Sequence, residues 1–199
     1  VEGVSGGLSG AGDRRVFHVL RGLADVILVG AATVRAEGYG PARPREGWAR
    51  LRAGRPPTPP IAVVTRRIDL DLDGPLFTAA EPHARPIVIT TAAAPAARLA
   101  QARRVAEVIV AGADRVDPRR AVAALHERGL GRILCEGGPV LNGLLAAAGL
   151  VDEVCLTVSP LLLGGDAARI LDGAPVRTGL TLVQILEEDG FLFCRYHRR

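Results

Sequence analysis

The sequence predicts one α/β domain: a mostly parallel mixed sheet, helices on both faces, and a C-terminal antiparallel hairpin. Short continuous runs of Val, Ile and Leu alternate with helical patterns, as expected for strands that helices cover on both sides. Near the C-terminus, two longer runs instead flank Glu188-Asp189-Gly190, a sequence typical of a hairpin turn. The 199 residues suffice to bury a sizeable core, and we expect residues 1–199 to form a single domain.

Each element follows from its local pattern. The expected strands are residues 25–29, 61–65, 86–90, 107–110, 132–135 and 154–158, followed by the hairpin strands 181–187 and 191–197. The expected helices are residues 13–23, 31–36, 95–102, 118–128 and 139–148. Asp13 and Asp117 are suitable N-caps, the second of them followed by proline at the first helical position. Gly129 and Gly149 are typical C-terminal stops. The segment 38–60, rich in Arg, Pro and Gly, is expected to be a long loop of functional importance or a tolerated surface excursion.

Composition excludes several function classes. The net charge is +4, and all 25 basic residues are Arg, but the Arg-Arg pairs are scattered among acidic residues without interleaved aromatics, so no nucleic-acid groove is expected. No apolar run approaches the roughly 20 residues of a membrane helix. Three cysteines do not form a disulfide framework, which favours a reduced, cytoplasmic protein. His, Cys and Asp show no metal-ligand spacing, and no metal is expected.

Three segments carry candidate chemistry. A predicted strand runs into Gly30, and Thr33 lies in the first turn of the next helix, so amides and a hydroxyl face any anion bound there. In Glu136-Gly-Gly-Pro139 another strand meets another helix start, at the sheet edge where α/β folds bind phosphorylated cofactors. Because a carboxylate repels phosphate, we expect Glu136 to face a cationic or hydrogen-bond-donating ring. The third segment is the Ser-Pro-Leu-Leu-Leu-Gly-Gly run at 159–165.

In this order, residues 25–34, 136–142 and 159–165 resemble the riboflavin-biosynthesis reductase family, the 5-amino-6-(5-phosphoribosylamino)uracil reductases. These form the C-terminal domain of bifunctional deaminase-reductases and share the dihydrofolate reductase fold. The zinc deaminase signature is absent from the sequence, so the chain resembles the stand-alone pyrimidine reductase branch. The family's first strand would precede Val1, and we expect this N-terminal strand to be missing here.

The resemblance also implies a cofactor, a substrate and partners. It implies an NADPH-dependent reductase that transfers a hydride to a ribosylaminopyrimidine and forms a homodimer; it assigns no catalytic acid or base. The implied substrate contacts are Ser5, Arg21 and Glu136. The implied cofactor contacts are Gly7, Thr33, Glu37, Thr65, Gly138, Pro139, Val140, Leu141, Asn142, Gly143 and Leu144. Arg66 and Arg67, directly after Thr65, favour NADPH over NADH because guanidinium groups bind phosphate well.

Two alternatives remain open from the sequence. The family's usual phosphate-site pattern after Thr33 is absent, although Arg43 or Arg45 could substitute for its arginine. A dihydrofolate or other pterin reductase on the same fold is therefore one alternative. The other lies outside enzymes: a non-catalytic NADP-binding module.

Overall fold

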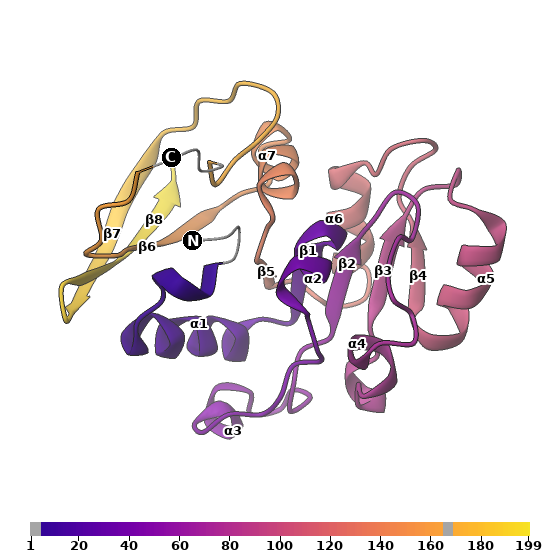
Figure 1. Cartoon of the computed structure of the whole chain (residues 1–199), viewed down its shortest axis with the longest axis horizontal. Coiled ribbons are helices and arrows are strands. Elements are labelled where there is room, and N and C mark those ends of the chain that lie inside the picture. The colour runs from indigo at the N-terminus through magenta and orange to yellow at the C-terminus, as the bar shows by residue number, and fades with distance from the viewer. Residues whose placement is uncertain (1–4, 165–168) are drawn as a thin grey trace.

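The computed structural model describes residues 5–164 and 169–199 of the chain (Figure 1). Its helices are η1 (Ser5–Leu8), α1 (Ala11–Leu23), α2 (Ala31–Glu37), α3 (Trp48–Leu51), α4 (Pro75–Thr78), η2 (Pro82–Ala84), α5 (Ala96–Val105), α6 (Pro118–His126) and α7 (Pro139–Ala147). Its strands are β1 (Val26–Gly30), β2 (Ile61–Val64), β3 (Ile87–Thr90), β4 (Glu107–Val110), β5 (Ile133–Cys135), β6 (Glu153–Val158), β7 (Leu180–Glu188) and β8 (Phe191–Arg198). None of the described helices is long and apolar enough to cross a membrane.

The first five strands form a parallel sheet in the order β4-β3-β2-β1-β5. Alternate residues of each strand point to opposite faces, which divides the core into two layers. On β1, Ile27 and Val29 pack with side chains from α2, α4 and α5. Val26 and Leu28 pack instead with side chains from α6 and α7. The predicted α/β class, with helices on both faces of a parallel sheet, is confirmed.

The last three strands form a separate antiparallel sheet in the order β6-β8-β7. The predicted hairpin is confirmed: Asp189 and Gly190 have φ angles of 51° and 78°, as a two-residue turn with both central residues left-handed requires. The expectation of one mixed sheet needs refinement, because the hairpin pairs with β6 and no ladder joins the two sheets within the described residues. Figure 1 shows α1 lying against this second sheet.

Helix boundaries follow the predicted caps at most positions. The Asp117 carboxylate accepts hydrogen bonds from the amides of Arg119 and Arg120 at the start of α6. Gly129 and Gly149 follow α6 and α7 with positive φ. The prediction for Asp13 is wrong: α1 begins earlier with Gly10 as its N-cap. The Asp13 carboxylate instead accepts a 2.7 Å hydrogen bond from the Thr157 hydroxyl of β6, so it joins α1 to the second sheet.

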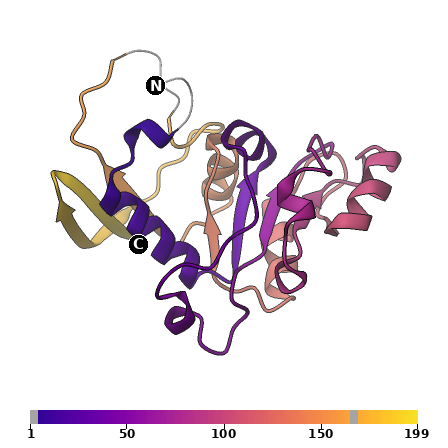
Figure 2. The same cartoon turned by 60° about the horizontal axis from the view of Figure 1, so that its bottom comes forward.

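Residues 38–60, here called the strap, are fixed to the end of α1 (Figure 2). Trp48 is 3% exposed, and its indole N–H donates to the His18 carbonyl at 2.9 Å. Arg52, also 3% exposed, donates to the carbonyls of Gly22, Ala24 and Pro56. The strap is therefore an ordered part of the fold rather than a free surface excursion.

Candidate functional site

The turns after β1 and β5 meet at the carboxyl edge of the parallel sheet. The Gly30 amide donates to the Gly137 carbonyl at 2.7 Å. A Cβ atom added to Gly138 would lie 2.7 Å from the Thr33 hydroxyl oxygen, closer than real Cβ contacts allow. The Gly137–Gly138 peptide bond is cis. Glycine at 138 is thus what permits the Thr33 hydroxyl and the start of α7 to approach each other.

The start of α7 offers backbone donors at the same edge. Gly138 is the N-cap and makes no side-chain capping hydrogen bond, with Pro139 in the first turn. The amides of a first helical turn have no partner within the helix, and the helix dipole favours an anion near them. Val140 and Leu144 are exposed, whereas the Leu141 side chain is buried. Any contact of Leu141 with a ligand would therefore use its backbone.

Asn142 and Gly143 hold α7 against the segment that follows β6. The Asn142 side chain accepts from the Cys135 thiol at 3.3 Å and donates to the Ile170 carbonyl at 3.0 Å. A Cβ atom on Gly143 would lie 2.0 Å from the Asp172 carbonyl oxygen, so only glycine fits there. Burial raises the pKa of the Cys135 thiol to about 11, which keeps it protonated at neutral pH and unsuited to be a nucleophile.

A buried ion pair lies directly beside the glycine turn. Arg21 donates from Nε to Glu136 Oε1 and from Nη2 to Glu136 Oε2, both at 2.6 Å. The Tyr39 hydroxyl donates to Glu136 Oε2, also at 2.6 Å. The side chain of Glu136 is only 3% exposed and that of Arg21 is 20% exposed. We call Arg21, Tyr39 and Glu136 the carboxylate cluster.

The local sequence explains how the carboxylate cluster forms. Leu134 packs on the core face that the strap also covers, and Cys135 packs on the α7 face, so alternation turns Glu136 toward the strap. Arg21 lies in the last turn of α1. Tyr39 follows Gly38, whose φ of 60° ends α2 and allows the chain to turn into the strap.

Electrostatics and ring contacts hold the cluster together. Burial alone would lower the pKa of Arg21, but the hydrogen bonds and charge of Glu136 outweigh it and raise that pKa. Burial and the neighbouring Glu136 carboxylate both raise the pKa of Tyr39, so its hydroxyl stays a donor. The Arg21 Cζ atom lies 4.6 Å from the centre of the Phe17 ring and 5.6 Å from that of Tyr39, within cation–π range.

The structure places the other residues of interest around this edge or outside its description. Thr65 follows β2 at the carboxyl edge, but it is buried and its hydroxyl accepts from the Ile68 amide at 3.0 Å. Glu37 is exposed at the end of α2, and Gly7 is exposed in η1. Ser5 begins η1. Gly165 of the third motif lies outside the described residues.

Sequence reasoning missed Tyr39 and Phe17. Tyr39 lies between two glycines in a segment without periodicity, so nothing local predicts its contact with Glu136, a residue 97 positions away. Phe17 precedes Arg21 by one helical turn, and that spacing was the available signal for a ring stacked on the guanidinium.

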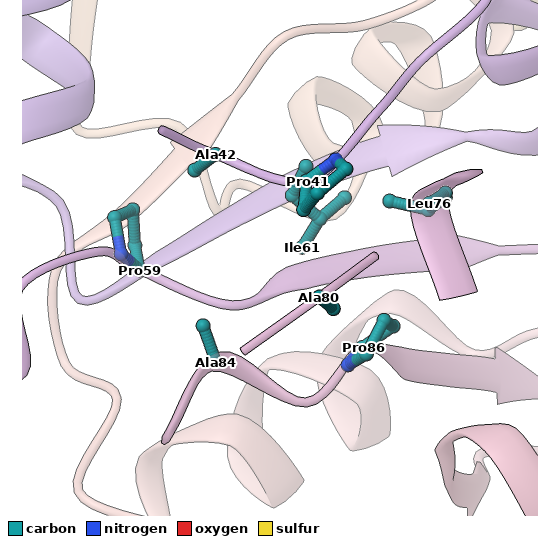
Figure 3. A pocket seen from close by; sticks show the side chains of 8 residues that line it. All are labelled: Pro41, Ala42, Pro59, Ile61, Leu76, Ala80, Ala84 and Pro86. Atoms are coloured by element: carbon teal, nitrogen blue, oxygen red, sulfur yellow. The ribbon is translucent and has the colours of Figure 1, made fainter. Parts of the chain in front are cut away.

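An apolar gap lies at the opposite end of the parallel sheet. Figure 3 shows apolar side chains around the amino ends of β2 and β3, opposite the glycine edge, and the space that they line is too small to hold a water molecule. Its lining is apolar: Pro41, Ala42, Pro59, Ile61, Leu76, Ala80, Ala84 and Pro86. Without a polar group to orient a ligand, this space is a packing gap rather than a binding site. The described residues contain no cluster of side chains suited to a metal ion.

Together, fold and site define an α/β domain whose parallel sheet presents glycine turns, a helix start and a buried carboxylate at one edge. The model of the RibD C-terminal domain family matches residues 2–190. The chain belongs to this family, the reductase family of riboflavin biosynthesis, and the predicted resemblance is confirmed.

Individual relatives agree with this assignment. The chain is 36% identical over 167 residues to the 2,5-diamino-6-ribosylamino-4(3H)-pyrimidinone 5′-phosphate reductase of Methanothermobacter thermautotrophicus, covering 83% of this chain and 74% of that protein. It is 32% identical to the reductase of the same name from Archaeoglobus fulgidus, covering 81% and 74% of the two chains. The crystal structure of a pyrimidine reductase-like protein from Corynebacterium diphtheriae superposes with a TM-score of 0.90 at 31% identity, covering 100% of this chain and 86% of that one.

Proposed function

We propose that the protein is an NADPH-dependent reductase of 2,5-diamino-6-ribosylamino-4(3H)-pyrimidinone 5′-phosphate or a closely related ribosylaminopyrimidine phosphate. The observation that carries this proposal is the buried Glu136 carboxylate directly beside the Gly137-Gly138 turn. A carboxylate that can bind a heterocycle therefore lies next to backbone amides that can bind an anionic cofactor. The relatives from Methanothermobacter thermautotrophicus and Archaeoglobus fulgidus are named as reductases of the pyrimidinone phosphate, which favours this substrate over a pterin.

The residues at the glycine edge fit a dinucleotide. The α7 start has no side-chain cap, and the Thr33 hydroxyl lies close to the backbone of Gly138. Gly138 through Leu144 would hold the cofactor's pyrophosphate, with Thr33, Glu37, Thr65 and Gly7 along its length. Because Thr65 is buried whereas Arg66 and Arg67 are exposed, we assign phosphate recognition there to these two arginines. The bound nicotinamide supplies the hydride.

The carboxylate cluster would orient the substrate ring. The pyrimidinone carries amino and ring N–H donors, which match a carboxylate acceptor. Glu136 would accept from such a donor, while the bidentate contact with Arg21 fixes the plane of the carboxylate. Arg21 Nε and Nη2 are committed to Glu136, so its remaining nitrogen would be the one available to the substrate. Ser5 would contribute from η1.

Homodimer formation is part of the proposal. One face of the second sheet carries Leu156 and Val158 of β6, Leu182 and Ile185 of β7, and Leu192 of β8, as the register shows. Their side chains are 36–50% exposed. A contiguous apolar sheet face of this kind marks an interaction surface. We assign it to a second copy of the chain, and sedimentation at several concentrations would show a dimer that Ile185→Asp weakens; a monomer throughout would refute the assignment.

Gly138→Asp tests the cofactor site. The substitution adds bulk against Thr33 and negative charge beside the helix start, so NADPH affinity should fall by at least tenfold in a fluorescence titration. Gly131→Asp is the matched control, because a Cβ atom there meets nothing within 4 Å. Equal affinity of the two variants, both folded, would contradict the site assignment.

A further inference from the structure

We propose that Tyr39 is a positioning residue of the active site: its hydroxyl orients the Glu136 carboxylate so that Oε1 is the oxygen offered to the substrate ring. This inference deepens the proposed function and rests on it. It assigns a role to a residue that no sequence motif marked.

The hydrogen-bond geometry singles out one oxygen. Among the described residues, Glu136 Oε2 accepts two hydrogen bonds, one from Arg21 Nη2 and one from the Tyr39 hydroxyl. Oε1 accepts one, from Arg21 Nε. Each carboxylate oxygen has two lone-pair positions. The hydrogen bond from Tyr39 therefore fills the second lone-pair position of Oε2, and the lone-pair position that stays open is on Oε1.

Tyr39 is not needed to hold the strap in place. Further along the chain, hydrogen bonds from the Trp48 indole and the buried Arg52 hold the strap against α1. Arg55 adds hydrogen bonds to the Leu51 and Leu23 carbonyls. The Tyr39 backbone is fixed separately, since its amide donates to the Val34 carbonyl at 3.2 Å. Removing the hydroxyl alone should therefore leave the strap and the fold intact.

Arg21, the other side chain that donates to Glu136, cannot replace Tyr39 at Oε2. Arg21 already makes a bidentate contact, and its guanidinium also contacts the Phe17 and Tyr39 rings. A planar guanidinium held at two oxygens fixes the plane of the carboxylate. Arg21 gives one hydrogen bond to each oxygen and therefore does not make the two oxygens different. The Tyr39 hydroxyl does, because it donates to Oε2.

Tyr39→Phe is the test, with Tyr196→Phe as matched control. Tyr196 is the chain's other tyrosine, on β8 in the second sheet. With the pyrimidinone phosphate as substrate, Tyr39→Phe should lower kcat/KM by about tenfold to a hundredfold, as for loss of a hydrogen bond to a charged group. NADPH affinity should match that of the control, and both variants should be folded at the assay temperature.

The two Michaelis constants separate positioning from packing. The Tyr39 hydroxyl contacts Glu136, which is assigned to the substrate. Tyr39→Phe should therefore raise the KM for the pyrimidinone phosphate and leave the KM for NADPH unchanged. Tyr196→Phe should leave both constants in place.

The outcomes are distinguishable. A wild-type protein that does not oxidise NADPH with the substrate overturns the proposed function, and this inference with it. A wild-type protein that turns over while Tyr39→Phe retains its kcat/KM and its KM for the pyrimidinone phosphate overturns the role of Tyr39 alone. A Tyr39→Phe variant that recovers the wild-type kcat/KM when assayed well below its melting temperature also overturns it, because loss of stability then explains the effect.

Discussion

Replacing Arg21 by Met should destabilise the protein far more than replacing an exposed arginine. Met keeps much of the length and apolar bulk of the side chain but removes both charge-assisted hydrogen bonds to Glu136. The carboxylate, 3% exposed, is then left with the Tyr39 hydroxyl as its remaining partner in the cluster. Breaking a buried ion pair on one side costs about 3–5 kcal/mol.

The expected loss converts into a measurable change in melting temperature. For a domain of this size, 1 kcal/mol corresponds to roughly 2–4 °C, so Arg21→Met should melt about 6–20 °C below the wild type at pH 7. Calorimetry and denaturant titration would both report it.

Arg128→Met is the matched control for this experiment. It also removes one arginine from an ion pair, but the side chains of Arg128 and Glu107 are 34% and 46% exposed. Exposed pairs contribute about 0–1 kcal/mol, so this variant should melt within a few degrees of the wild type. Equal effects of the two substitutions would refute the view that burial makes the Glu136 pair energetically distinct.

Three further predictions concern the scaffold. Arg52→Met should cost about 2–4 kcal/mol in denaturant unfolding, because three carbonyls lose a buried donor; a loss no larger than that of the exposed Arg50→Met would contradict it. Gly190→Ala should cost about 1–2 kcal/mol, since its φ is 78°, while Gly131→Ala should be neutral or stabilising; similar unfolding midpoints would argue against the assigned turn. For Asp25, burial alone would raise the pKa, but hydrogen bonds from the Arg132 amide and from Arg55 lower it below its usual 3.8. The ionised Asp25 then stabilises the fold fully at pH values above 3.8, and this stabilisation is lost as the pH falls through the lowered pKa. The stability difference between wild type and Asp25→Asn should therefore be constant near neutral pH and shrink in acid, and a difference that grows in acid would contradict the sign.

Much of the fold could be predicted because local patterns and tertiary structure agree. The strands of the parallel sheet are continuous apolar runs covered on both faces, and the Asp189-Gly190 turn has the dihedrals its sequence favours. The N-cap of α1 was mispredicted because Asp13 has a tertiary partner, Thr157, which local propensity does not include. The division into two sheets was not predictable either, because strand pairing is a long-range property.

The candidate site, too, could be predicted only in part from the sequence. The glycine turn and Glu136 were recognisable from strand-to-helix motifs, and the structure places them side by side with Thr33. The pairing of Arg21 with Glu136 spans 115 positions and that of Tyr39 with Glu136 spans 97. Neither contact has a local signature, so sequence reasoning could nominate Arg21 and Glu136 separately without linking them, and it passed over Tyr39.

The most direct test of the central claim is NADPH oxidation by the purified chain, followed by nicotinamide absorbance, with the pyrimidinone phosphate and dihydrofolate supplied in parallel. The account predicts turnover of the pyrimidinone phosphate and its loss in Gly138→Asp but not in Gly131→Asp. Turnover of dihydrofolate alone would contradict the proposed substrate. If NADPH raises the melting temperature but neither compound is reduced, the protein binds its cofactor without the proposed reaction.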